Sequence, residues 1–132
     1  VQPVVRHGQP PTTIELTTIE TEDLANILKE LFDKNRIKGY QSIAVITKNR
    51  AEAIHVANAL QHVPVQLLED NSVLEKEPLL IVPAYLAKGL EFDVAIIYSV
   101  EGFSSSLFEQ KLLYVAMTRA MHALYLIQLH PI

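Results

Sequence analysis

The sequence predicts an α/β domain with three layers, in which helices cover both faces of a mostly parallel sheet. Short runs of nearly continuous apolar residues recur along the chain, and segments with a helical spacing of apolar residues lie between several of them. Strands that are apolar on both faces are buried on both sides, which is typical of parallel sheets. The crossovers between such strands are expected to be right-handed.

The composition fits a single folded domain. The chain has 132 residues, of which 49% are hydrophobic and 20% are charged, and this is enough for one core. The absence of cysteine excludes disulfides, thiolate catalysis and cysteine-bound zinc. No apolar stretch reaches the roughly 18 residues that span a bilayer, so we expect a cytoplasmic protein with no membrane partner. Because the first residue is Val1 and not methionine, we expect residues 1–132 to be a fragment of a longer protein.

Two classes of function are disfavoured. The formal charge is -4 at pH 7, whereas a domain that grips nucleic acid by itself carries a basic surface. We therefore do not expect tight autonomous binding to DNA or RNA. No metal site is expected, because the histidines are scattered without the spacing of metal ligands, at His7, His55, His62, His122 and His130.

The first half of the chain predicts an extended leading segment followed by a helix, a strand and a second helix. Residues 1–20 carry short strand-like runs on either side of a Pro-Pro pair that forbids a helix. Residues 21–39 have acids in the first turn, apolar residues at helical spacing and a closing Gly39 as C-cap. The apolar run at 42–47 predicts a strand, and residues 50–62 return to the helical period.

The second half predicts four further strands and one helix. The strands are expected at 63–68, 79–82, 93–100 and 123–129. The helix is expected to begin near Leu107, with Ser106 as its N-cap and Glu109 as the reciprocal partner of that cap.

Arg119 interrupts the apolar arc of this helix. On a helical wheel, one face holds Phe108, Leu112, Val115 and Ala116, and the opposite face holds Gln110, Lys111, Tyr114 and Thr118. Arg119 projects between Phe108 and Leu112, on the side that faces the core or a cleft. A buried unpaired charge costs several kcal/mol, so the guanidinium must pass the helix end into solvent or meet an anion. That anion is either a carboxylate of this domain or a phosphate at a domain boundary, and spacing alone does not choose.

The segment at residues 84–97, AYLAKGLEFDVAII, leads into a strand. Gly89 permits a positive φ or the close approach of another chain, and the carboxylates of Glu91 and Asp93 follow directly. By itself, AKG is common in ordinary polar loops.

Two strings together resemble a known family. AKGLEFDVAII and, some twenty residues later, LLYVAMTRAMHALYLI are similar over consecutive positions to motifs V and VI of superfamily 1 helicases of the UvrD/Rep type. Residues 42–60 resemble, more weakly, the strand and helix that precede these motifs. The resemblance implies a RecA-like (P-loop NTPase-type) domain, the second motor domain of such a helicase, with ATP bound between it and an N-terminal RecA-like domain.

The resemblance also implies roles for single residues. Arg119 matches the arginine finger that touches the γ-phosphate, and Glu91 matches the acid that contacts the ribose, with Gly89 holding the turn that presents it. ATP and Mg²⁺ would be held mainly by the other domain, since the chain has no GxxxxGK[ST] phosphate loop. We expect the isolated fragment to be inactive and the full protein to act on single-stranded or duplex DNA.

The sequence departs from the family pattern in the strand that precedes AKGLE. Pro83 and Tyr85 stand where typical members have the Thr and the His that line the nucleic-acid track. Tyr85 and Lys88 are the candidates for nucleic-acid contact here, although a tyrosine at a strand end is more often packed than stacked on a base.

Two rival functions accompany this interpretation. The short link between the strands at 63–68 and 79–82, together with YLAKGLEFD, resembles the HelD or helicase IV-like branch, some of whose members remodel RNA polymerase. The second rival is a degenerate, non-catalytic α/β interaction module, in which Arg119 would have no role in ATP hydrolysis.

Overall fold

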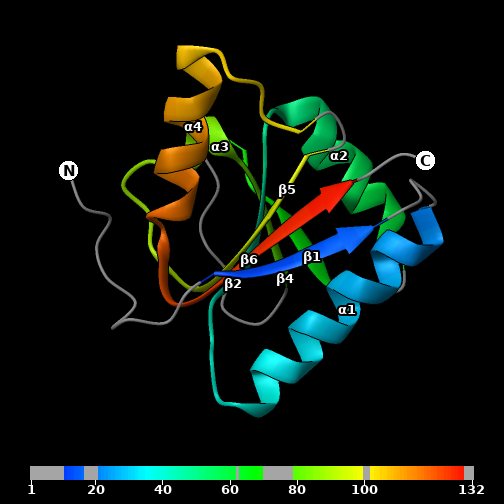
Figure 1. Ribbon diagram of the computed structural model, residues 1–132. Helices are drawn as coiled ribbons and strands as arrows, with labels where there is room; N and C mark the ends of the chain where they lie inside the picture. Colours follow the sequence, from blue (N-terminus) through cyan, green and yellow to red (C-terminus); the bar gives the residue numbers. More distant parts are fainter. Residues whose placement is uncertain (1–10, 17–20, 62, 70–78, 100–101, 130–132) are drawn as a thin grey trace.

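The protein is described here by a computed structural model, which covers residues 11–16, 21–61, 63–69, 79–99 and 102–129. The strands are β1 (Thr12–Leu16), β2 (Ile43–Thr47), β3 (Val65–Leu67), β4 (Leu79–Pro83), β5 (Phe92–Tyr98) and β6 (Ala120–Leu129), and the helices are α1 (Thr21–Ile37), α2 (Arg50–Ala59), α3 (Ala84–Ala87) and α4 (Leu107–Met117). The strands form one sheet in the order β1-β6-β5-β2-β4-β3, and each described pair is parallel. Figure 1 shows the sheet crossing the middle of the molecule.

Two apolar clusters, one on each face of the sheet, form the core. The first packs α1 and α2 against the sheet, and the second packs α3 and α4 against the other face. Alternate residues of β2 serve the two clusters: Ile43 and Val45 face α1 and α2, while Ala44 and Ile46 face α3 and α4. The predicted three-layer α/β architecture is therefore confirmed.

Helix α1 forms as its sequence predicts. Leu24, Leu28 and Leu31, spaced by three or four residues, are buried against the sheet. Gly39 takes a φ of 96° just beyond the helix, and its N–H donates to the carbonyl of Arg36 at 2.9 Å. The predicted C-cap at Gly39 is thus confirmed.

Several predicted boundaries shift. The second helix ends at Ala59 and not at residue 62, since the Leu60 N–H closes it onto the carbonyls of Val56 and Ala57. The last strand begins at Ala120, before the predicted 123, because Ala120 already pairs with Phe92 of β5. Of the leading segment 1–20, only β1 at the sheet edge and Pro11 fall within the described residues.

Helix α4 confirms its predicted cap and corrects two details. Ser106 is the N-cap, and its Oγ accepts from the Glu109 N–H at 3.2 Å. The Glu109 carboxylate accepts from the Ser104 N–H at 2.8 Å, whereas the predicted partner was Ser106, whose N–H donates to the Ser104 Oγ. The prediction that Phe108 faces the core is wrong: it is 74% exposed.

Candidate functional site

The two motif segments meet at the amino ends of β5 and β6. The Phe92 N–H donates to the carbonyl of Arg119 at 2.9 Å. The residue that follows Glu91 is therefore bonded directly to the backbone of Arg119. Glu91 and Arg119 are far apart in the sequence. They lie at the same end of the sheet because they precede two strands that are parallel neighbours.

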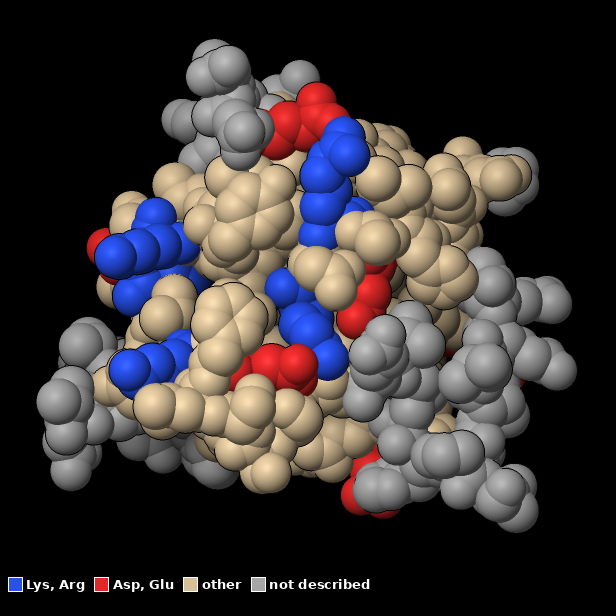
Figure 2. Space-filling view, turned by 90° about the horizontal axis from the view of Figure 1, so that it is seen from above, with Lys and Arg blue, Asp and Glu red and all other residues tan. Residues whose placement is uncertain are grey.

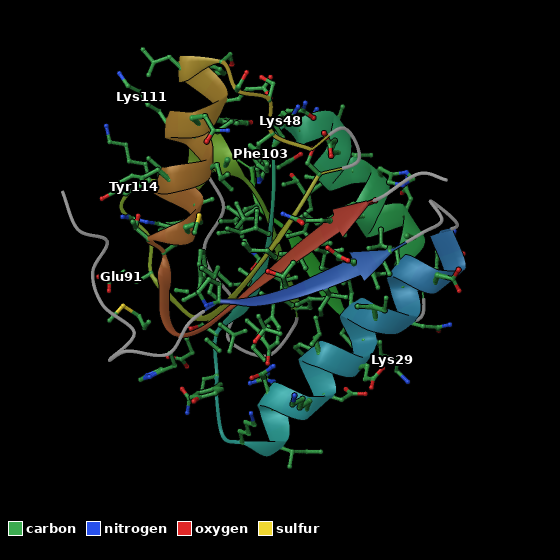
Figure 3. The ribbon with its side chains drawn as sticks, viewed as in Figure 1. Lys29, Lys48, Glu91, Phe103, Lys111 and Tyr114 are labelled. Carbon is green, nitrogen blue, oxygen red and sulfur yellow. The ribbon has the colours of Figure 1, made fainter. Side chains whose placement is uncertain are left out.

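The turn before β5 has the conformation that its glycine allows. Gly89 takes a φ of +84°, and a Cβ added there would have no atom within 4 Å. The turn is closed by the Leu90 N–H, which donates to the Ala87 carbonyl at 3.0 Å. Of the two roles that the sequence allows for Gly89, the positive φ is the one found, and the Glu91 side chain two residues later is exposed. Figure 3 shows Glu91 beyond the last turn of α4, on the outside of the molecule.

The Arg119 guanidinium is half-buried and directed toward this turn. Its Nε donates to the Val115 carbonyl at 3.2 Å, its Nη1 to the Leu90 carbonyl at 3.4 Å and its Nη2 to the Thr118 hydroxyl at 3.0 Å. A guanidinium carries five N–H donors. The neighbours thus use three of them, and the other two have no partner among the described residues.

The charge of Arg119 is stabilised without an acid. No carboxylate within the described part of the chain lies within ion-pair distance of its nitrogens. The Val115 carbonyl belongs to the last turn of α4, where the helix dipole favours a cation. The alternative in which Arg119 pairs with a carboxylate of this domain is therefore wrong for the described residues.

The two acids of the GLEFD segment have different surroundings. Asp93 Oδ2 accepts from the N–H groups of Gln41 and Ser42, at 2.9 and 3.3 Å, and the Asp93 N–H donates to the Ser42 Oγ at 2.8 Å. Asp93 thus joins the loop before β2 to the start of β5 and has a structural role. Glu91 has no such contact with the described residues and is exposed, so its carboxylate is accessible to a ligand.

The candidates for nucleic-acid contact are Tyr85 and Lys88. Tyr85 lies in the one-turn helix α3, and Lys88 directly follows that helix. Tyr85 is 53% exposed, so the expectation that it packs in the core is wrong. Lys88 is exposed as well and forms the C-cap of α3. Both side chains are accessible, but neither contacts Arg119.

The sequence interpretation missed a polar cluster at the opposite end of the sheet, where the strands have their carboxyl ends. Lys48, directly after β2, forms an ion pair with Glu109 at 3.0 Å, and its Nζ lies 5.8 Å from the centre of the Phe103 ring. The hydrogen bond from the Ser104 N–H and the ion pair with Lys48 lower the pKa of Glu109. Figure 2 shows basic side chains with acidic side chains beside them on this end of the molecule.

A second missed group is buried beside this cluster. Glu52, in the first turn of α2, is only 8% exposed and accepts from the Ser99 Oγ at 2.9 Å. Burial, and then the charge of Glu52, raise the pKa of Tyr98. No sequence signal marked Glu52, because the helix period predicts only that α2 has one buried face.

Helices on both faces of a parallel sheet form an α/β fold that matches a helicase C-terminal RecA-like domain. Residues 78–127 match the family model of the UvrD-like helicase C-terminal domain. Both strings that carry the predicted resemblance lie within these residues, so the resemblance to UvrD-like helicases is confirmed. The assignment to the HelD-like branch is not confirmed.

A solved structure shows the same fold. The C-terminal domain of a possible DNA helicase from Lactobacillus plantarum WCFS1 superposes with a TM-score of 0.81 and is 28% identical, over 96% of this chain and 78% of that one. Xpd4 of S. tokodaii gives a TM-score of 0.45 at 10% identity, over 94% of this chain and 35% of that one. Among curated proteins, no match was found.

Within the described residues, no three histidine, cysteine or acidic side chains are arranged to hold a metal ion. None of the helices in the described ranges is both long and apolar enough to cross a membrane.

Proposed function

We propose that this chain is the C-terminal motor domain of an ATP-dependent superfamily 1 DNA helicase. In this proposal it supplies Arg119 as arginine finger and Glu91 as ribose contact to ATP bound against an N-terminal RecA-like domain. The observation that carries the proposal is the Arg119 guanidinium, which among the described residues has two N–H donors without a partner and no neutralising carboxylate, next to the turn that presents Glu91.

The charge and geometry of Arg119 suit phosphoryl transfer. A planar guanidinium with adjacent free donors matches the oxygens of a phosphate. When a second domain brings the γ-phosphate to it, the fixed cation neutralises the charge that develops on the transferred group. Its three bonds to Val115, Leu90 and Thr118 hold it in place beforehand, so little reorganisation is needed.

ATP and Mg²⁺ would be bound mainly outside this chain. The 132 residues contain no GxxxxGK[ST] segment, and such a loop is what cradles the phosphates and positions the metal. This chain would contribute the cation at the γ-phosphate and, through Glu91, a hydrogen bond to the sugar. Closure of the two domains around ATP would then couple hydrolysis to movement along DNA. Tyr85 and Lys88 are proposed to contact the strand.

The test is substitution of Arg119 in the intact protein. We expect Arg119→Ala to lower the ATPase rate by about 10³-fold or more, as for arginine fingers in related reactions. Arg119→Lys should restore little, because an ammonium lacks the planar fork. The control is Arg50→Ala, which removes an exposed arginine paired with Glu69. Unchanged hydrolysis by Arg119→Ala would favour the non-catalytic interaction module.

The short connection between β3 and β4 supports a second proposal. The chain passes from Leu67 to Leu79 without room for a large inserted domain. We propose, as the alternative, that the same ATPase acts in a HelD-like factor that remodels RNA polymerase. Strand separation by the intact protein, measured with a labelled duplex, would contradict this alternative. ATPase stimulation by RNA polymerase and not by DNA would support it.

A further inference from the structure

Helix α4 leaves a row of large apolar side chains exposed. Leu107 is 72% exposed, Phe108 74% and Tyr114 39%, and Lys111 between them is exposed as well. Leu107, Lys111 and Tyr114 are spaced by four and three residues, so they form one line along the helix, with Phe108 beside it. These four residues are called the α4 stripe below.

The stripe points away from the core. Figure 3 shows Lys111 and Tyr114 extending from the side of α4 that faces away from the sheet. Single exposed apolar residues are ordinary on protein surfaces. One leucine and two aromatic rings exposed on the same side of a helix favour, in contrast, an interaction surface.

The charge of the stripe limits what can cover it. Glu109 is the one acid of α4, and it turns inward to Lys48 at 3.0 Å. The cation of Lys111 is therefore not balanced by an acid of its own helix. A matching surface would be apolar, with a carboxylate opposite Lys111. A nucleic-acid strand fits less well, because it carries one negative charge per nucleotide and the stripe offers one cation among apolar groups.

The stripe leads to the candidate site. The Thr118 N–H donates to the Tyr114 carbonyl at 3.1 Å, and the Thr118 hydroxyl accepts from Arg119 Nη2. The 11 residues of α4 extend over about 16 Å. A stable protein interface buries about 800 Å² on each partner, which corresponds to a patch of about 16 Å radius. A domain that brings a phosphate to Arg119 can thus reach the whole stripe.

We infer that the α4 stripe is the docking surface for the domain that holds the ATP. This inference rests on the proposed function and adds which face of the chain that domain contacts. The phosphate-holding domain then presents an apolar surface to Leu107, Phe108 and Tyr114, and a carboxylate to Lys111. Docking along α4 and binding of the nucleotide at Arg119 are parts of one closure.

The first experiment uses the intact protein with the substitutions Leu107→Ser, Phe108→Ser and Tyr114→Ser combined. The expected result is a rise of at least about 10-fold in KM for ATP, because closure is weakened by loss of apolar contacts. The matched control is Ile37→Ser, which removes an apolar side chain that is 87% exposed at the end of α1. A charge reversal, Lys111→Glu, tests the carboxylate and should also raise KM.

The second experiment measures contact directly, so that the result does not depend on activity. Hydroxyl-radical footprinting of the intact protein, with and without a non-hydrolysable ATP analogue, should show at least about 5-fold protection of Phe108 and Tyr114 and none of Ile37. Equal labelling in both states, or protection by a single-stranded oligonucleotide and not by nucleotide, would overturn the inference. If Arg119→Ala abolishes hydrolysis while the stripe variants behave like Ile37→Ser, the docking inference fails and the proposed function stands.

Discussion

Within the part of the chain that the structure describes, Arg119 is held by dipoles and by no opposite charge. Its partners are two carbonyls and one hydroxyl, those of Val115, Leu90 and Thr118. A salt bridge to a carboxylate of the same domain would neutralise the charge before a ligand arrived. Because the carbonyl at the end of α4 only compensates it in part, the guanidinium keeps most of its attraction for an anion.

Glu91 is expected to affect ATP binding more than the chemical step. Its carboxylate is exposed and has no contact in the described part of the chain, so it is available to the sugar hydroxyls. For Glu91→Ala in the intact protein, we expect KM for ATP to rise by about 10-fold or more, as for loss of a hydrogen bond to a charged group, with little change in kcat. Steady-state kinetics with ATP and its 2′- and 3′-deoxy analogues measure this.

The deoxy analogues provide the control for Glu91. If the carboxylate binds a sugar hydroxyl, the wild-type protein should discriminate against one of the two analogues, and Glu91→Ala should lose that discrimination. Equal discrimination by both proteins would contradict the proposed contact.

Gly89 is expected to matter through its backbone. A side chain at a φ of +84° is strained, although the space around Gly89 is open. Gly89→Ala should therefore lower the free energy of unfolding by about 1–2 kcal/mol, and it should also raise KM for ATP because the Glu91 turn is distorted. Thermal unfolding and ATPase assays of the intact protein measure the two effects.

Gly102 offers a matched control, because its φ is +71° and it too has open space around it. It lies in the loop before α4, at the other end of the sheet. Gly102→Ala should lower stability by a similar amount and leave KM unchanged. If Gly102→Ala raised KM as much as Gly89→Ala does, the cause would be the general loss of stability and not the distortion of the Glu91 turn.

At the level of single residues, the sequence predicts what depends on local chemistry. A positive φ at Gly89 and a capping role for Ser106 follow from the residue types, and both are found. The exposure of Tyr85 and Phe108 does not follow, because it depends on whether another element covers that part of the helix. The first turn of α4 has no such cover at Phe108.

Among the secondary structure elements, α4 runs from the polar cluster of Lys48 and Glu109 at one end of the sheet to the Arg119 site at the other end. Its first turn is fixed by the Ser106 cap and the pair of Glu109 with Lys48. Its last turn supplies the Val115 carbonyl to Arg119. Ala116, next to Val115, is fully buried, and Leu112 and Leu113 pack against the same apolar cluster, so the inner face of the helix is packed against the sheet.

The contacts of Glu109 with the Ser104 N–H and with Lys48 should make the stability of the fold depend on pH. The folded state lowers the pKa of Glu109 below its ordinary value of 4.5. The ionised carboxylate therefore stabilises the fold above that value, and the contribution is lost as pH falls through the folded-state pKa. Glu109→Gln should lower Tm at about pH 7, and the difference from the wild type should shrink at about pH 3.

Thermal unfolding followed by circular dichroism at the two pH values measures the effect of Glu109→Gln. Glu30→Gln, on the exposed face of α1, is the control and should leave the pH dependence of Tm as in the wild type. If Glu109→Gln lowered Tm by the same amount at both pH values, the side chain would act through its shape and not through its charge.

Element boundaries were less predictable than element types. The α2 helix ends at Ala59 because the cap at Leu60 forms there, and no glycine or proline in the sequence marks that position. Strand β6 begins early because Ala120 pairs with Phe92 across a register shift. Both boundaries are set by hydrogen bonds to other parts of the chain or by cap geometry, which periodicity does not encode.

For the whole molecule, the apolar runs predict a parallel sheet but leave the strand order open. The observed order brings β5 and β6 together, and this pairing places Glu91 and Arg119 at the same end of the sheet, with the residue after Glu91 bonded to the Arg119 carbonyl. The proximity of these two residues was implied by the resemblance to UvrD-like helicases and by no property of the residues alone. The pair of Lys48 with Glu109 was missed because it joins the residue after β2 to the first turn of α4, which periodicity treats separately.

The last prediction concerns the chain as a unit. The 132 residues alone should not hydrolyse ATP above the rate of buffer, because Arg119 and Glu91 supply only two contacts and the sequence has no phosphate loop to bind the β- and γ-phosphates or to position Mg²⁺. The measurement is phosphate release by the purified chain, with circular dichroism to show that it is folded and with the intact protein as positive control. Hydrolysis by the chain that Arg119→Ala abolishes would mean that these residues hold a complete catalytic site. The proposal that the nucleotide is bound between two domains would then be wrong.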